Sequence, residues 1–243
     1  MIRRGGPAWQ PLAVLADPGG VLRRAVTAPH PAAIGAALFA ALAALGLATL
    51  PRQVSLLGAA LAPTGDLLLD RQQAQLEAGV LRLIVVDRLV PAPTLLVAGL
   101  LLACSAEPVL MLAREQRRAI WAAVLLGLAP LLVQRVGELA ITYLTDQPGW
   151  NAGDAVTLPH RFVTGPLLVW RSGHPPLWLQ RLDARSGLIV VWAVGLWAAG
   201  LKQLDGGRLQ PWHVALPAAC AAGAGVITWL LGPVALAAVL RAG

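Results

Sequence analysis

Two ionisable residues, Arg135 and Glu138, lie within an otherwise apolar run, AIWAAVLLGLAPLLVQRVGELA. Their spacing of three places both side chains on one face of a helix, where they can form an ion pair. Ionisable groups inside a membrane are costly, and they are candidates for a transport path or a binding site. Glu107, near the end of another apolar run, is a similar candidate, although Arg114 and Arg118 follow closely enough to pair with it. We favour a structural pair in both cases and keep Glu107, Arg135 and Glu138 as the candidate intramembrane polar site.

The sequence carries none of the motifs that would assign an enzymatic mechanism. It has no G-x-x-x-x-G-K-[ST] for nucleotide phosphates, no H-E-x-x-H for zinc and no G-x-S-x-G for a serine nucleophile. Ser172 and His174 lie in a Pro-rich loop without an acid at a telling spacing, and Cys104 and Cys220 lack metal-ligand spacing. His213 is the best-placed histidine for a pigment or haem, but it borders an apolar run rather than lying inside one. We therefore expect no catalytic residue, no metal, no cofactor and no enzymatic activity.

The composition indicates that most of the chain faces something other than water. Of the 243 residues, 57% are hydrophobic and 13% are charged, with a mean hydropathy of +0.68. Soluble domains carry about 25% charged residues. The net charge of +7 comes from scattered arginines without an aromatic stripe, which argues against nucleic acid and favours lipid headgroups as their partners. All basic residues except Lys202 are arginine, and Ala and Leu fill the apolar runs, a bias typical of GC-rich bacterial genes.

The apolar runs predict an all-α integral membrane protein, a bundle of five transmembrane helices. A helix rises about 1.5 Å per residue, so about 20 residues cross a hydrocarbon core of roughly 30 Å. The fifth run is longer than necessary and contains Pro217 and Pro233, which predicts a tilt or a kink. The predicted spans are residues 31–50, 92–112, 119–140, 187–204 and 213–240.

Positive charge orients the predicted bundle. With five spans, the N-terminus and the loops after the second and fourth spans lie on one side, and their basic residues are the more densely spaced. The positive-inside rule then places the N-terminus in the cytoplasm and the C-terminus in the periplasm of a bacterial inner membrane. The basic residues on the cytoplasmic side are Arg3, Arg4, Arg23, Arg24, Arg114, Arg117, Arg118, Lys202 and Arg208.

Segments outside the spans predict helices that lie on the membrane surface. In the cytoplasmic segment 1–30, Asp17 is the expected cap of a short helix that begins with Pro18. The apolar face of this helix would rest on lipid, with arginines toward the phosphates. That face consists of Val21, Leu22, Ala25 and Val26.

Two long loops complete the predicted layout. The loop 51–90 is apolar but interrupted by charge, and a sixth span there would bury three charges at roughly 2.5–3.5 kcal/mol each. We therefore expect amphipathic helices on the outer leaflet. The three charges that a sixth span would bury are those of Arg82, Asp87 and Arg88. In the loop 143–186, tryptophans predict a belt at the headgroup layer; they are Trp150, Trp170 and Trp178.

Three stretches of the sequence resemble the Yip family (Ypt-interacting-protein type) of membrane proteins. LADPGGVLRRAVTAPHPAA is similar to the opening of bacterial members, AIWAAVLLGLAPLLV to their proline-bearing third span, and SGLIVVWAVGLWAAGLKQLDGG to the fourth span and its turn. The chain departs from the family pattern where Gly127 is followed by Leu128 rather than by tyrosine, and it lacks the acidic-Leu-Tyr-Gly-Pro signature of eukaryotic members. The resemblance implies a non-enzymatic protein that shapes membrane or holds partners through helix contacts.

Faces of small residues agree with that implication, because they allow helices to approach closely. The candidate interface residues are Ala36, Ala40 and Ala44 in the first span and Ala218, Ala222 and Gly225 in the fifth. We therefore favour an inner-membrane scaffold or accessory subunit that binds other membrane proteins. A small transporter or channel that uses the candidate polar site is one alternative, and a subunit of an electron-transfer or photosynthetic complex is another.

Overall fold

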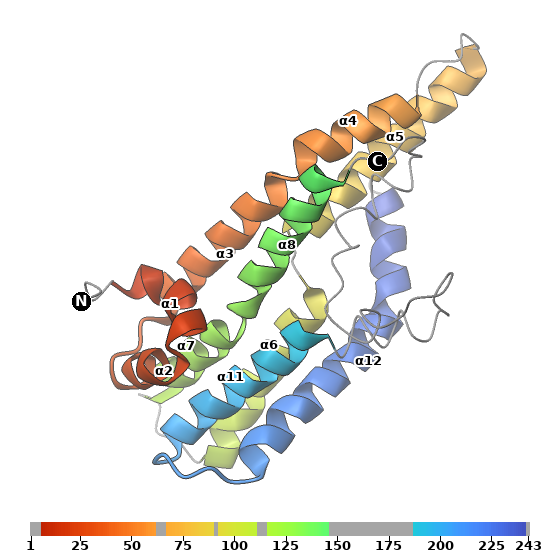
Figure 1. Ribbon diagram of the computed structural model, residues 1–243. Coiled ribbons are helices and arrows are strands. Elements are labelled where there is room, and N and C mark those ends of the chain that lie inside the picture. Colours follow the sequence, from red (N-terminus) through yellow and green to blue (C-terminus); the bar gives the residue numbers. More distant parts are fainter. Residues whose placement is uncertain (1–5, 62–66, 90–91, 111–115, 146–186, 242–243) are drawn as a thin grey trace, which may run out of the picture. The chain divides into compact units, whose positions relative to one another are not determined.

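The computed structural model describes residues 6–61, 67–89, 92–110, 116–145 and 187–241, and every regular element within these ranges is helical (Figure 1). This confirms the all-α part of the predicted fold class. The elements are η1 (Pro7–Trp9), α1 (Gln10–Ala16), α2 (Pro18–Thr27), α3 (Pro31–Leu47), α4 (Leu50–Ala60), α5 (Leu67–Leu89), α6 (Pro93–Leu110), α7 (Arg117–Gly127), α8 (Pro130–Leu144), α11 (Leu188–Leu204) and α12 (Trp212–Arg241).

Three helical stretches in the described residues are long and apolar enough to cross a membrane. They are Pro31–Ala59, formed by α3 and α4, Arg117–Leu144, formed by α7 and α8, and Trp212–Leu231 within α12. Two shorter apolar helices, Pro93–Pro108 in α6 and Leu188–Leu204, correspond to the other two predicted spans. The structure therefore supports a membrane-embedded protein with three candidate spans, and the bundle of five remains a prediction.

The contacts divide the chain into two compact units. Among the described residues, unit 1 comprises 6–41, 92–110, 116–133 and 187–229. Unit 2 comprises 42–61, 67–89, 134–145 and 230–241.

Helix α7 lies at the centre of unit 1, where it packs against α2, α6 and α11. Close packing depends on small residues at the contacts. A side chain on Gly127 would overlap the indole ring of Trp197, and a Cβ on Gly200 would lie 2.9 Å from that of Ala123. Trp197 is 1% exposed, so α11 is fixed against α7 by a large side chain that fits over a glycine.

The predicted third span is interrupted at Pro130, where α7 ends and α8 begins. Pro130 has no N–H to donate, and the turn before it tightens, so the N–H of Leu128 donates to the carbonyl of Leu125 at 3.1 Å. An unbroken α-helix would instead direct that N–H to the carbonyl of Val124. The indole Nε1 of Trp197 donates to the Val124 carbonyl at 2.9 Å, so a side chain from α11 satisfies the acceptor that the break releases.

The short N-terminal helix has the predicted cap and a different environment. The Asp17 carboxylate accepts a hydrogen bond from the backbone N–H of Gly20 at 2.9 Å, and α2 begins at Pro18 as expected. The sequence predicts that the apolar face of α2 rests on lipid. In the structure, this face instead packs on α7 and α11, and Val21 and Leu22 are fully buried. The apolar side of α2 therefore joins the core of unit 1.

In unit 2, the loop predicted to contain amphipathic helices does form two helices, α4 and α5, which pack against each other. Leu56 and Leu57 of α4 are buried against Val80 and Leu81 of α5 and Ile141 of α8. The position of α4 and α5 on the outer leaflet remains a prediction.

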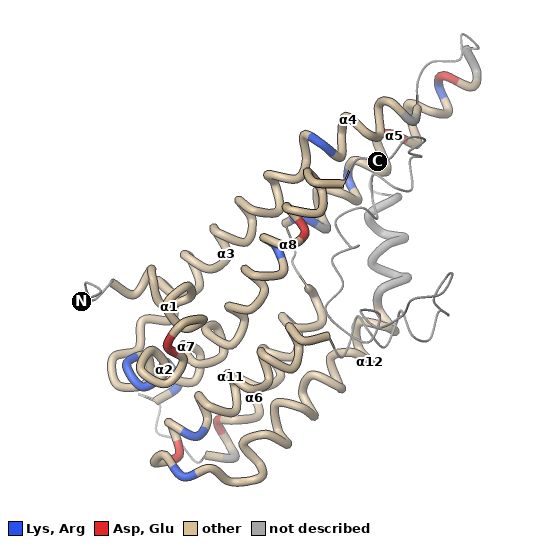
Figure 2. The backbone as a smooth tube through the Cα atoms, in the orientation of Figure 1, with Lys and Arg blue, Asp and Glu red and all other residues tan. Residues whose placement is uncertain are grey.

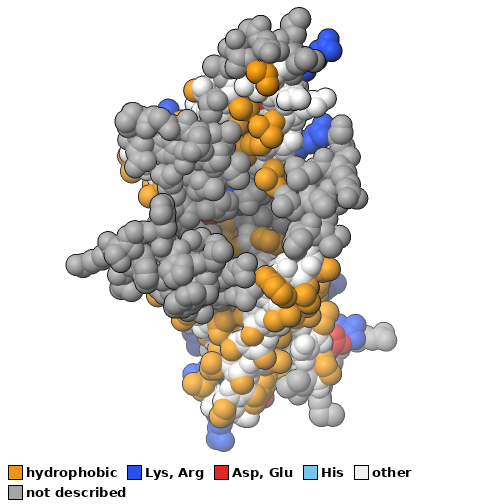
Figure 3. All heavy atoms as spheres, turned by 90° about the vertical axis from the view of Figure 1, so that its right-hand side faces the viewer, with side chains coloured by type: hydrophobic (Ala, Val, Ile, Leu, Met, Phe, Trp, Pro, Cys, Tyr) orange, Lys and Arg blue, Asp and Glu red, His pale blue; other side chains and the backbone are white. Residues whose placement is uncertain are grey.

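Helix α12 runs without interruption from Trp212 to Arg241 through Pro217 and Pro233. Only 22% of its candidate span is buried, compared with 72% for Arg117–Leu144. Figure 3 shows hydrophobic side chains gathered on the face of unit 1 to which α12 contributes, and the exposed residues include Val214, Val226 and Trp229. An apolar surface of this kind is expected where lipid or another membrane protein covers a helix.

Candidate functional site

Two members of the candidate polar site, Arg135 and Glu138, form a buried ionic cluster with Arg88 in unit 2. Figure 2 shows basic and acidic positions close together on the backbone of α8. The Glu138 carboxylate oxygen Oε2 lies 2.6 Å from Nη1 of Arg135 and 3.1 Å from Nη1 of Arg88. The three residues are 1–4% exposed. The predicted pair of Arg135 and Glu138 therefore exists, and sequence reasoning missed its third member.

The helical repeat of α8 brings several donors to Glu138. Arg135 lies three residues before it, and the side chain of Gln134, four residues before it, donates from Nε2 to Oε1 at 2.9 Å. The hydroxyl of Thr142 donates to the backbone carbonyl of Glu138 at 2.7 Å. Both carboxylate oxygens of Glu138 thus accept hydrogen bonds from side chains of its own helix, and Arg88 adds one from α5.

Arg135 also caps the C-terminal end of α5. Its Nη2 donates to the backbone carbonyl of Arg88 at 3.3 Å, one of the last carbonyls of α5 that lack a partner within the helix. A cation at this position is favoured by the negative end of the helix dipole. The single guanidinium of Arg135 therefore connects α8 to α5 twice, through Glu138 and through the backbone.

The same carbonyl of Arg88 lies against Gly46 of α3. A Cβ at Gly46 would lie 2.5 Å from the Arg88 oxygen, so glycine is required for this approach. Just beyond Gly46, the Thr49 hydroxyl donates to the Gly46 carbonyl at 2.7 Å, and the Tyr143 hydroxyl of α8 donates to the carbonyl of Ala48 at 2.9 Å. Backbone contacts and the ionic cluster therefore hold the ends of α3, α5 and α8 together within unit 2.

The distances support a structural role for the ionic cluster best: it holds α5 and α8 together. An isolated charge inside an apolar region is strongly destabilising, whereas a carboxylate that accepts from two guanidinium groups and an amide is well compensated. The sequence signal for Arg88 is its register on α5: Leu81, Ile84 and Arg88 lie on one face, and Ile84 is 1% exposed. A basic residue that continues an apolar face indicates an acidic partner on the helix it contacts.

Glu107 lies apart from the cluster, in unit 1, and forms an ion pair with Arg117. The sequence predicts Arg114 or Arg118 as its partner; in the structure it is the neighbouring Arg117 at the start of α7. The Glu107 and Arg117 side chains are 34% and 51% exposed, which is typical of a surface pair.

His213 is fully buried at the start of α12, with both ring nitrogens in contact with polar groups. Its Nδ1 accepts a hydrogen bond from the backbone N–H of Gln210 at 2.8 Å, and its Nε2 lies 3.1 Å from an oxygen of Asp205. These contacts connect the start of α12 to the turn that follows α11. Across the described ranges, no group of three His, Cys, Asp or Glu side chains is arranged to hold a metal ion.

Five of the six small residues predicted as interface candidates are exposed. On α3, Ala36, Ala40 and Ala44 are all exposed; of the three candidates on α12, Gly225 alone is buried. The other two exposed members are Ala218 and Ala222.

Several predictions fall outside the described residues. These are the tryptophan belt at Trp150, Trp170 and Trp178, the loop residues Ser172 and His174, and the basic residues Arg3, Arg4 and Arg114.

No protein-family model matches the chain, and no curated protein or solved structure matches it. The resemblance to the Yip family therefore rests on three stretches of sequence.

Proposed function

We propose that the protein is a non-enzymatic scaffold or accessory subunit of a bacterial inner membrane that binds partner membrane proteins through helix–helix contacts. The observation that supports this proposal most directly is the exposure of small residues on two apolar helices. Ala36, Ala40 and Ala44 on α3 are spaced by four residues and form one strip along the helix. This strip is not covered by the described part of the chain.

Small residues matter because the hydrophobic effect does not drive association between helices in lipid. Acyl chains are as apolar as leucine, so helices associate where their backbones approach closely and pack more tightly than lipid does. A strip of alanines presents a smooth surface for such an approach. In the proposed orientation, the N-terminus lies in the cytoplasm and α3 enters the bilayer from that side.

The test is co-purification from native membranes after alanines of the strip have been replaced by leucine. We expect the tagged wild-type chain to retain a partner membrane protein in mild detergent, and Ala36→Leu with Ala40→Leu to lose it. Cys104→Leu is the matched control, because Cys104 is a small, exposed residue on a different apolar helix, α6. Migration of the wild type as a lone monomer in mild detergent, or equal retention by all variants, would contradict the proposal.

A small transporter or channel is the second candidate function, and the ionic cluster is the observation that favours it. Buried ionisable groups within a candidate span are functional candidates by default. On this hypothesis, Arg135→Leu with Glu138→Met and Arg88→Met abolishes ion flux into proteoliposomes while the protein still folds. Flux that persists in the triple variant would remove this candidate and leave the cluster with its structural role.

A further inference from the structure

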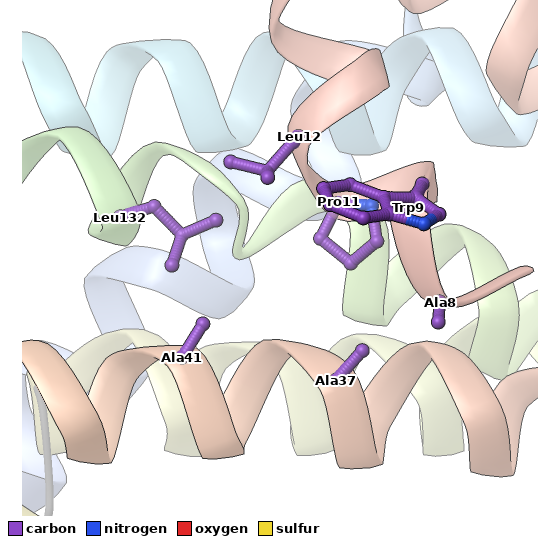
Figure 4. A pocket seen from close by; sticks show the side chains of 7 residues that line it. All are labelled: Ala8, Trp9, Pro11, Leu12, Ala37, Ala41 and Leu132. Atoms are coloured by element: carbon purple, nitrogen blue, oxygen red, sulfur yellow. The ribbon is translucent and has the colours of Figure 1, made fainter. Parts of the chain in front are cut away.

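An apolar groove lies within unit 1 between the N-terminal segment and α3 (Figure 4). Its volume is about 310 Å³. The only polar side-chain atom among its lining residues is the indole nitrogen of Trp9. The lining residues are Ala8, Trp9, Pro11, Leu12, Ala37, Ala41 and Leu132.

Water is a poor occupant of this groove. At roughly 30 Å³ per molecule, the volume corresponds to about ten waters, and each needs two to four polar partners that the lining does not provide. A groove of this volume holds less than one turn of a helix about 10 Å in diameter, so a partner helix would insert only side chains into it. The groove therefore suits a thin, flexible hydrocarbon chain.

The α3 residues that line the groove lie within the half of the candidate span that one leaflet would cover. Ala37 and Ala41 lie six and ten residues after Pro31, the first residue of the candidate span, or about 9 and 15 Å along the helix axis. Half of a hydrocarbon core of about 30 Å is about 15 Å. An acyl chain that runs from the start of the span to about the middle of the membrane would therefore pass Ala37 and Ala41.

Side chains of the types expected at a headgroup layer lie on the N-terminal segment that forms one wall of the groove and on the helix packed against it. Trp9 is 64% exposed, and an indole ring of this kind is favoured at the interface between acyl chains and water. Helix α2, which packs on α1, carries Arg23 and Arg24, and both are exposed. Guanidinium groups on this neighbouring helix are complementary to a phosphate.

We propose that this groove is a binding site for one acyl chain of a membrane phospholipid, held between Trp9 and Leu12 on one side and Ala37 and Ala41 on the other. The site differs from the proposed partner surface, because Ala36 and Ala40 on the same helix do not line the groove. Adjacent alanines of α3 therefore serve a lipid and a protein partner, and substitutions separate the two functions.

The experiment counts phospholipids that remain bound during native mass spectrometry of protein released from mild detergent. We expect the groove-filled variant, Ala37→Leu with Ala41→Leu, to retain one phospholipid fewer than the wild type. The matched control, Ala36→Leu with Ala40→Leu, should retain the wild-type number. Equal numbers for wild type and groove-filled variant would overturn the proposal, as would a retained isoprenoid quinone in place of the phospholipid.

A second measurement keeps the proposal testable if the groove-filled variant does not fold. A phospholipid with a photoreactive group on its acyl chain is incorporated with the wild-type protein into nanodiscs and activated by light. We expect adducts on the peptide that contains Trp9 and Leu12; their absence there, with labelling elsewhere, would overturn the proposal. Co-purification of a protein partner should be unchanged in Ala37→Leu with Ala41→Leu, so failure of the lipid site and failure of the partner surface give different results.

Discussion

The Glu138→Gln substitution tests whether the ionic cluster stabilises the fold. Glutamine preserves the size of the side chain but removes the negative charge that Arg88 and Arg135 share, 3.1 and 2.6 Å from Oε2. Removing one partner from a buried ion pair costs about 3–5 kcal/mol, because the remaining charge loses its compensation. For a chain of this size, about 2–4 °C is lost per kcal/mol, so we expect the unfolding temperature to fall by roughly 6–20 °C.

The fluorescently tagged protein is heated in the same detergent for every variant, and the fraction that stays folded is measured by size-exclusion chromatography. Glu107→Gln is the control, since it removes the same charge from an exposed pair with Arg117 and should cost no more than about 1 kcal/mol. Combining Arg88→Met and Arg135→Leu with Glu138→Met removes all three charges and should recover much of the lost stability. If Glu138→Gln unfolds within about 2 °C of the wild type, the ionic cluster does not stabilise the fold.

Three further substitutions test individual contacts by the same unfolding assay. Gly127→Ala should destabilise the protein by about 1–3 kcal/mol, because the added methyl group overlaps the buried Trp197 ring. Gly195→Ala is the control: Gly195 lies at an exposed helical position with open space, so this change should stabilise the protein by about 0.5–1 kcal/mol. Equal destabilisation by both substitutions would contradict the role of Gly127 in packing. Gly46→Ala should also destabilise by about 1–3 kcal/mol, since the obstacle is a backbone oxygen, and a neutral result would show that the helices separate easily. Asp17→Ala should cost about 1 kcal/mol by removing the cap of α2, and Asp17→Asn, which keeps the acceptor oxygen, should retain most of that stability.

Local patterns in the sequence predict most of the described helices and several of their ends, although not η1 and α1. The cap of α2 follows from Asp17 and Pro18, two residues whose preferences act within one turn. The apolar runs predict where helices form because lipid and a helical core both favour continuous apolar segments. The pair of Arg135 and Glu138 is likewise a consequence of helical spacing alone.

The remaining features depend on contacts between segments that are distant in sequence. The α7–α8 break was missed because Pro130 within an apolar run is compatible with a kinked span, and its outcome depends on the Trp197 indole from 73 positions away. The burial of α2 was missed because an amphipathic face does not reveal whether lipid or protein covers it. The sequence alone predicts Arg88 at the membrane surface, because burying its charge is costly unless the carboxylate of Glu138 compensates it, and that contact is visible only in the structure.

The position of Arg88 on α5 explains how a helix with several charges can still be part of the fold. Arg82 and Arg71 are exposed, so these two charges in the body of α5 face away from the packed side. Arg88 is the second-to-last residue of α5, where its side chain reaches Glu138 and its carbonyl accepts from Arg135. A charge at the end of a helix can be compensated by the dipole and by side chains of a neighbouring helix, whereas a charge at its centre would need a partner at full membrane depth. The cluster therefore holds the C-terminal end of α5 against α8.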